Sequence, residues 1–176
     1  MFFKKKKRYK TTSKHIHIGK EEIANGDPQE LIQPMWWSVS IYDGKNKYNR
    51  DLNVFSLPQR YIFAIQWYVS EVNNGGHDQF YFNSTGIVWK DALIGLKEIN
   101  HVAAYNILKE SSERLGGNPS MNRKERINQL NELNLNFDDL DSDFYDIIDL
   151  DDFIMEYIKQ NEEYFYFDGK VKVTCL

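Results

Sequence analysis

Residues 56–83 constrain the fold of this 176-residue chain more than any other stretch. Ser56-Leu57-Pro58-Gln59 has the Ser-x-x-Gln pattern of a capping box with an early proline, which predicts the start of a helix. Apolar residues then recur every three or four positions, which predicts that one face of this helix is buried. They are Ile62, Phe63, Ile65, Trp67, Val69 and Val72.

The helix is expected to stop at Asn74-Gly75-Gly76, because glycine adopts the left-handed backbone of a sharp reversal at little cost. One or two helical turns should follow before Ser84-Thr85-Gly86. Gln79 and Asn83 are four residues apart, so they share a helix face. We interpret the polar residues here as structural ties between the two helices, because buried polar groups are nearly always hydrogen-bonded. They are Glu71, Asn74, Gln79 and Asn83.

An alternative interpretation places a site at the same turn. Glu71, His77, Asp78 and Gln79 would offer an acid and a base to one pocket, as an enzyme or a small-molecule binder requires. No nucleophile elbow, phosphate loop or metal triad accompanies them. The sequence therefore predicts no catalytic residue and no cofactor, and this alternative requires a pocket that those four side chains line.

The rest of the chain predicts a mainly α, single multi-helix domain. Its length suits one domain, and its 41% hydrophobic and 27% charged residues are typical of a globular protein. Asp27-Pro28-Gln29-Glu30 predicts a second helix start, with Pro34 as a break and Asp43-Gly44 as the end. Residues 45–53 are expected to form a polar loop. Residues 1–20 form a basic arm, and residues 21–176 the helical domain.

The two ends of the chain predict a small β-structure. Ile16–Ile18 lies in an alternating segment, which is typical of a strand. Residues 164–173 predict a hairpin with its turn at Asp168-Gly169. This hairpin could pair with Ile16–Ile18, which would bring the termini together. The alternative is that the preceding helix continues to Phe165 and the tail is loose. His15 and His17 share a strand face, but no third ligand completes a metal site, so none is predicted.

Charge is distributed unevenly. Residues 1–60 carry a net charge of +6, residues 61–124 are neutral, and residues 125–176 carry −10. The segment Lys4–Lys10 could attach to nucleic acid or to a membrane, as a third class of function. No apolar stretch is long enough to span a bilayer, and no signal-peptide core follows the basic start. The one cysteine, Cys175, favours a reducing compartment, so we expect a cytoplasmic protein.

Eight aspartates occur within fifteen residues near the end of the chain. If the segment were wholly helical, it would be roughly 22 Å long, with a charge about every 2.8 Å. One DNA strand carries a charge about every 3.4 Å, so the line density suits an imitation of phosphates. The alternative is that the aspartates are solvated helix caps. They are Asp138, Asp139, Asp141, Asp143, Asp146, Asp149, Asp151 and Asp152.

The segment Glu71–Gly86 resembles the signature of the bacterial DNA-mimic protein family, Glu-x-x-Asn-Gly-Gly-x-x-Gln-Phe-Phe-x-Asn. The chain departs from it at Tyr81, where the family has a second phenylalanine. The resemblance extends over about residues 56–165 and leaves out the basic arm. The matching positions are Glu71, Asn74, Gly75, Gly76, Gln79, Phe80 and Asn83.

This resemblance implies a mainly helical fold, no cofactor and no known catalytic residues. It favours a non-enzymatic protein-interaction module, in its most specific form an acidic decoy that binds a DNA-binding protein. The eight aspartates would form the partner-binding surface, and the motif would be structural. Direct nucleic-acid or membrane binding is not expected, and a homodimer stays open as an alternative.

Overall fold

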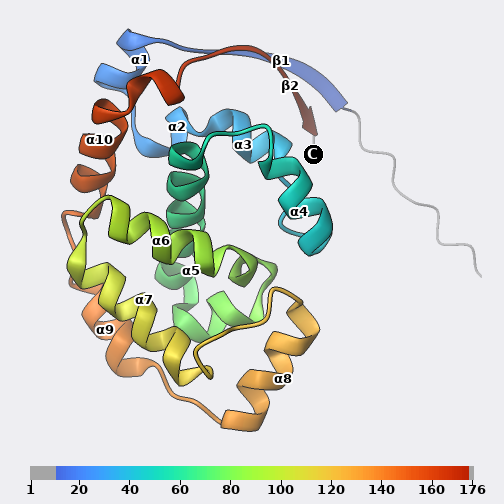
Figure 1. Cartoon of the computed structure of the whole chain (residues 1–176), viewed down its shortest axis with the longest axis vertical. Coiled ribbons are helices and arrows are strands. Elements are labelled where there is room, and N and C mark those ends of the chain that lie inside the picture. The colour runs from blue at the N-terminus through green and yellow to red at the C-terminus, as the bar shows by residue number, and fades with distance from the viewer. Residues whose placement is uncertain (1–10, 175–176) are drawn as a thin grey trace, which may run out of the picture.

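The computed structural model describes residues 11–174, which form ten α-helices and two strands (Figure 1). The mainly α prediction is confirmed, together with a small β-structure at the termini. The elements are β1 (Thr11–Ile18), α1 (Lys20–Asn25), α2 (Pro28–Leu31), α3 (Gln33–Ser38), α4 (Lys45–Leu52), α5 (Leu57–Phe82), α6 (Trp89–Glu98), α7 (Val102–Arg114), α8 (Arg123–Leu133), α9 (Asp138–Tyr145), α10 (Leu150–Gln160) and β2 (Phe167–Thr174), with short 3₁₀ turns at Ser84–Val88 and Glu162–Tyr164.

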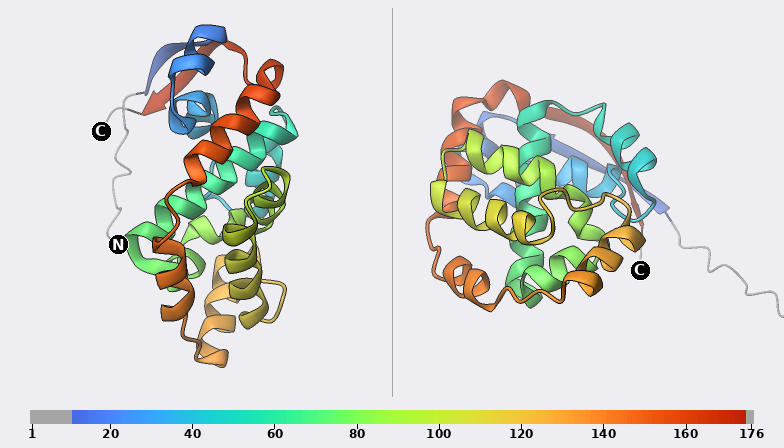
Figure 2. Two further views of the ribbon diagram at one scale, coloured as in Figure 1. Left: turned by 90° about the vertical axis from the view of Figure 1, so that its left-hand side faces the viewer. Right: turned by 60° about the horizontal axis from the view of Figure 1, so that its bottom comes forward.

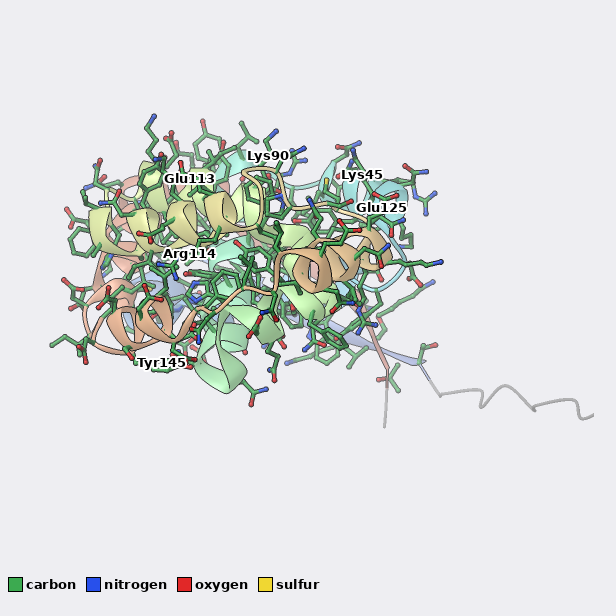
Figure 3. The ribbon with its side chains drawn as sticks, turned by 90° about the horizontal axis from the view of Figure 1, so that it is seen from below. Lys45, Lys90, Glu113, Arg114, Glu125 and Tyr145 are labelled. Carbon is green, nitrogen blue, oxygen red and sulfur yellow. The ribbon has the colours of Figure 1, made fainter. Side chains whose placement is uncertain are left out.

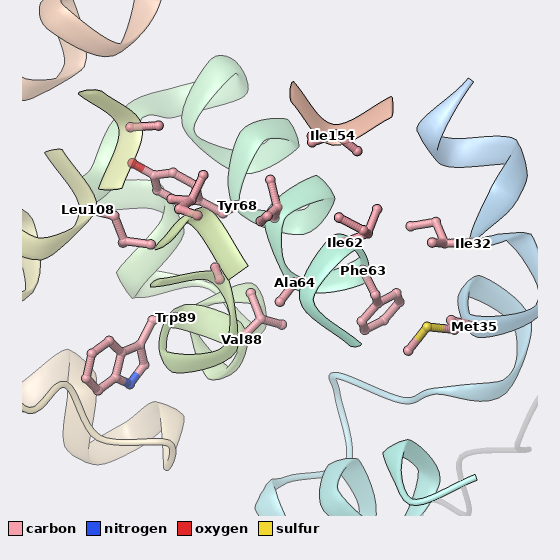
Figure 4. Close-up of a cluster of buried hydrophobic side chains, with 14 of the residues drawn as sticks. Ile32, Met35, Ile62, Phe63, Ala64, Tyr68, Val88, Trp89, Leu108 and Ile154 are labelled. Carbon is pink, nitrogen blue, oxygen red and sulfur yellow. The ribbon is translucent and has the colours of Figure 1, made fainter. Parts of the chain in front are cut away.

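Helix α5 runs through the middle of the molecule, and the other helices surround it (Figure 1). Its predicted capping box is present: the Ser56 hydroxyl accepts a hydrogen bond from the backbone N–H of Gln59. Ile62, Phe63 and Val72 are fully buried, as the apolar spacing predicts. Figure 4 shows that the core around α5 draws side chains from several elements, among them Met35 of α3, Leu108 of α7 and Ile154 of α10.

The β1–β2 ribbon lies at one end of the long axis, and α8 and α9 lie at the other (Figure 2). The strands are antiparallel, with Thr11 opposite Thr174 and Ile18 opposite Phe167. The predicted Asp168-Gly169 turn is therefore wrong, because both residues lie inside β2, opposite His17 and Ile16. The predicted pairing of this segment with Ile16–Ile18 is confirmed. It buries Ile16 and Ile18, which one flat hairpin would not achieve.

Two local predictions before α5 also need correction. The helix capped by Asp27 ends at Leu31, a second helix covers Gln33–Ser38, and neither reaches Asp43. Gly44, with φ of +81°, begins a new helix, and residues 45–52 form α4 where a polar loop was expected. The side chains of Tyr48 and Leu52 are buried, so packing on the core stabilises this helix. The polar composition of the segment does not indicate it. The helix start predicted at Asp27 is confirmed, since the Asp27 carboxylate accepts from the Glu30 backbone N–H at 2.9 Å.

A fully buried arginine joins α8 to the end of α5. The Arg126 guanidinium donates to the backbone carbonyls of Tyr81 at 2.7 Å, Asn83 at 2.7 Å and Ser120 at 2.5 Å. The last carbonyls of a helix lack intrahelical partners and carry partial negative charge, so they suit a cation. A side chain at Gly86 would collide with Arg126 Nε, so the turn after α5 requires a glycine there.

Candidate functional site

The glycine pair interrupts α5 and divides it into two helical segments that meet at a kink. Gly76 has φ of +72° and ψ of −176°, a conformation that residues with a side chain rarely adopt. Gly75 has an extended φ of −170°, but a Cβ there would collide with the Gln79 amide. The predicted reversal is thus a kink, after which the helix resumes to Phe82.

Glu71 ties the two segments together across the kink. Its Oε1 accepts hydrogen bonds from Gln79 Nε2 at 3.0 Å and from Asn83 Nδ2 at 2.5 Å. Phe80 is buried in the core, and Asn74 is exposed. The contacts of Glu71, Gln79 and Asn83 support the structural interpretation of the motif.

His77, directly after the kink, is fully buried and connects α5 to α9. Its Nε2 accepts from the Tyr68 hydroxyl at 2.8 Å, and its Nδ1–H donates to Asp141 Oδ1 at 2.5 Å. The same carboxylate oxygen accepts from the His77 backbone N–H at 2.9 Å, so Asp141 also caps the second segment of α5. A Cβ on Gly76 would collide with the Asp141 carboxylate, so the motif makes room for α9 to approach.

Two further contacts fix α9 on its sides. The Tyr145 hydroxyl donates to the Val72 carbonyl at 3.1 Å, just before the kink. Arg114 of α7 donates to both carboxylate oxygens of Asp139, at 2.6 and 2.5 Å (Figure 3). This bidentate pairing lowers the pKa of Asp139 to about 2. Helix α9 is therefore held by both segments of α5 and by α7.

We expect the buried His77 to make folding stability depend on pH. Burial lowers the pKa of His77 below its ordinary value of 6.5, although Asp141 acts in the opposite direction. The unfolded chain therefore takes up this proton first as the pH falls, so His77 stabilises folding fully above about pH 6.5 and less below it. The midpoint of urea unfolding should be lower at about pH 5.5 than at about pH 7.5. The control is the double variant His15→Gln, His17→Gln, which should keep this difference; its disappearance there would contradict the assignment to His77.

The eight aspartates do not lie on one continuous helix. Helix α9 ends at Tyr145 and α10 begins at Leu150, so the even spacing expected of a wholly helical segment is wrong. Phe144 and Leu150 are buried in the core and fix both helices. Ile148, in the connection between them, is 95% exposed, which no apolar pattern indicates.

Three of the eight aspartates bind an arginine or histidine side chain within the described residues. Asp139 pairs with Arg114, and Asp141 is partly buried against His77. Asp149 precedes α10 but does not cap it with its side chain, which instead accepts from His101 Nε2 at 3.1 Å. The other five are exposed and form no ion pair within residues 11–174. We call them the acidic face: Asp138, Asp143, Asp146, Asp151 and Asp152.

Comparison with known proteins shows which family the chain belongs to. The model of the DMP19-like protein family matches residues 54–161, which include the kink and both acidic helices. The chain belongs to the DMP19-like protein family. Among curated proteins and solved structures, none matches it. The region shared with the DMP19-like family runs from α5 to the end of α10 and leaves out the basic arm and the β1–β2 ribbon.

The structure does not gather the four residues of the alternative site in this DMP19-like protein. Asp78 and Gln79 line a groove between the kink and α8, but Glu71 and His77 are absent from its walls. His77 has no exposed surface and faces Tyr68 and Asp141. The single pocket that this alternative requires is therefore not formed.

Asp78 instead lies beside the acidic face, and its position in the sequence does not indicate this. It directly follows His77, which binds Asp141 through its backbone and its ring, so it lies close to the start of α9. Partial burial raises the pKa of Asp78, and Asp141 and Asp138 raise it further. It lies some sixty residues from them in the chain, so only the folded structure shows the proximity. Asp78 extends the negative surface from α9 to the kink.

The remaining sequence expectations concern metals, membranes and the basic arm. His15 and His17 both lie beside Asp168, and no group of three or more metal-ligating side chains occurs in the part of the chain that the structure describes. None of the helices in that part is long and apolar enough to cross a bilayer. Lys4–Lys10 lies outside the described residues, so attachment through it stays a prediction.

Proposed function

We propose that this DMP19-like protein is a non-enzymatic interaction module that binds a basic, nucleic-acid-binding partner through its acidic face. In the most specific form it acts as a decoy that occupies the partner's nucleic-acid-binding surface. Family membership and the position of the acidic face on two well-anchored helices support this proposal. A surface that binds DNA presents lysine and arginine to the negative phosphates. Exposed carboxylates are also negative, so they can take the place of the phosphates on that surface.

The observation that carries the proposal is the position of Asp143 and Asp146 at the C-terminal end of α9. Asp138, Asp151 and Asp152 lie at or near helix N-termini, where negative charge is favourable, so local stability alone accounts for them. Asp143 lies in the last turn of α9, and Asp146 directly follows it. The helix dipole opposes both, and neither has an ion-pair partner in residues 11–174. Local stability does not account for these two charges, which supports a role in binding a partner.

This position predicts opposite effects on stability at the two kinds of site. The double variant Asp143→Asn, Asp146→Asn should raise the free energy of unfolding by about 0.5–1 kcal/mol, because it removes unfavourable charge at a helix C-terminus. The matched variant Asp151→Asn, Asp152→Asn should lower it by a similar amount, because it removes favourable charge from the first turn of α10. Urea unfolding at low salt measures both. A loss of stability in the first variant would show that those aspartates serve the fold.

Binding is tested with a variant in which all five aspartates of the acidic face are replaced by asparagine. Asp139, Asp141 and Asp149 are left intact, because their partners hold the structure together. The wild type should capture a nucleic-acid-binding protein from a bacterial lysate, and the variant should lose at least about 90% of that capture. The control removes five exposed charges elsewhere and should capture normally: Glu21→Gln, Asp43→Asn, Glu113→Gln, Glu132→Gln and Glu163→Gln. An equal loss of capture in the control would show that binding depends on net charge and not on the acidic face.

A further inference from the structure

A second surface, distinct from the acidic face, is a cleft of about 610 Å³ beside the starts of α4 and α6. This volume lies within the range of small-molecule sites, roughly 300–1,000 Å³. Its third wall is the segment Asn118–Arg123, which leads into α8. The cleft therefore combines three elements that are distant in sequence but lie side by side in the fold.

The cleft is positive although the chain as a whole has a net charge of −4. Lys45, Lys90 and Arg123 line it, and Figure 3 shows Lys45 and Lys90 around the same part of the surface as Glu125. Neither lysine forms an ion pair with any residue between 11 and 174. Glu125, the one carboxylate on its walls, accepts a hydrogen bond from the Ser120 hydroxyl at 2.7 Å. The local field therefore favours an anion.

Helix α4 begins at this cleft, because Gly44 and Lys45 both line it. Gly44 offers no side-chain cap, so the first N–H groups of this eight-residue helix have no capping acceptor. Trp89 is 6% exposed and its ring contributes to the cleft wall, whereas its indole N–H is buried beneath the surface. The indole N–H is therefore close enough to report on the cleft.

The other walls of the cleft are apolar. Ile41 and Ile87 contribute nearly buried side chains, and Met121 contributes a partly buried one. A small inorganic ion would leave these walls without a contact. An organic molecule with one anionic group and an apolar body would use both parts of the cleft.

We propose that this cleft binds a small organic anion, with a carboxylate or a phosphate group as its head. Lys45 and Lys90 contact the head together with the uncapped N–H groups of α4, and the ring of Trp89 forms part of the wall. Ile41, Ile87 and Met121 cover the apolar body. The site stands apart from the acidic face and does not depend on the decoy function.

The test uses three probes that share a ring: phenyl phosphate, benzoate and, as an uncharged control, benzyl alcohol. Each is titrated into the ¹⁵N-labelled full chain at constant ionic strength. The indole N–H resonance of Trp89, identified as the one that Trp89→Phe removes, should shift saturably with an anionic probe, as should the Lys45 amide. Binding of one anionic probe alone would identify the head group, and binding of both would leave the class as proposed.

Substitutions at two exposed lysines test binding without disturbing the core. Lys45→Gln and Lys90→Gln should each weaken probe binding about tenfold, because each removes a charged contact to the head. The control is Lys124→Gln, on α8 but outside the cleft, which removes the same charge and should change affinity less than about twofold. The proposal is overturned if neither anionic probe gives a saturable shift, if benzyl alcohol binds as tightly, or if Lys124→Gln weakens binding equally.

Discussion

Replacing Arg126 with methionine is expected to lower the free energy of unfolding by about 3–5 kcal/mol. Three backbone carbonyls would lose a charged donor, and each such hydrogen bond contributes about 1.5–3 kcal/mol. Burial opposes the charged arginine and lowers its pKa to about 10, so the net loss is smaller than the sum of the three bonds. Urea unfolding followed by far-UV circular dichroism measures the change.

The matched control for Arg126 is Arg123→Met on the same helix. Arg123 is exposed, donates to the Phe82 carbonyl at 2.8 Å and lies over the Phe82 ring. Its removal should cost less than about 1 kcal/mol, because water replaces the lost hydrogen bond. Similar losses in the two variants would contradict the view that the buried guanidinium is what joins α8 to the end of α5.

Replacing Gly76 with alanine should cost about 3–5 kcal/mol and should also displace α9. The backbone conformation alone costs about 1–3 kcal/mol for a residue with a Cβ. The new methyl group would also collide with the Asp141 carboxylate, which then loses its hydrogen bonds to His77. Thermal or urea unfolding measures the cost, and the amide exchange rate of His77 reports the loss of its acceptor.

The control for Gly76 is Gly117→Ala, at the stop after α7. Gly117 also has a positive φ, of +76°, but a Cβ there would meet no atom within 4 Å. It should therefore show the backbone cost alone, about 1–2 kcal/mol, with His77 exchange unchanged. If both variants lost the same stability, the close approach of Asp141 would have no energetic consequence, and the account of the kink would be wrong.

Features of this fold that depend on neighbouring residues follow from the sequence. The helix starts at Asp27 and Ser56 form as predicted, because each depends on backbone and side chains three residues apart. The apolar face of α5 is equally local, and so is the interruption at Gly75-Gly76, although it is a kink and not the predicted end of the helix. The motif contacts among Glu71, Gln79 and Asn83 belong to the same class, since they lie within one kinked helix.

Features that depend on distant partners do not follow from the sequence. Asp141 is indistinguishable from its neighbours in an acidic run, yet it caps a helix segment that begins 64 residues earlier. Arg126 lies in a polar helix that predicts exposure, but the unpaired carbonyls at the end of α5 bury it. The Asp-Gly pair at 168–169 favours a turn locally, and pairing with β1 overrides that preference.

This distinction changes how the acidic segment is understood. The charge density counted from the sequence includes all eight aspartates. In the fold, three of them pair with basic side chains and hold α9 and α10 in place. The remaining five, with Asp78 beside them, are what a partner would meet. Substitution of all eight would therefore confound folding with binding, whereas substitution of the five separates them.

The most direct measurement of the decoy proposal is a competition between this protein and duplex DNA for the purified captured partner. Binding is followed by fluorescence anisotropy of labelled DNA while unlabelled wild type or the five-aspartate variant is added. We predict that the wild type displaces the DNA completely, and that the variant displaces it at least about tenfold less effectively. A ternary complex, in which the partner holds DNA and this protein together, would contradict the central claim.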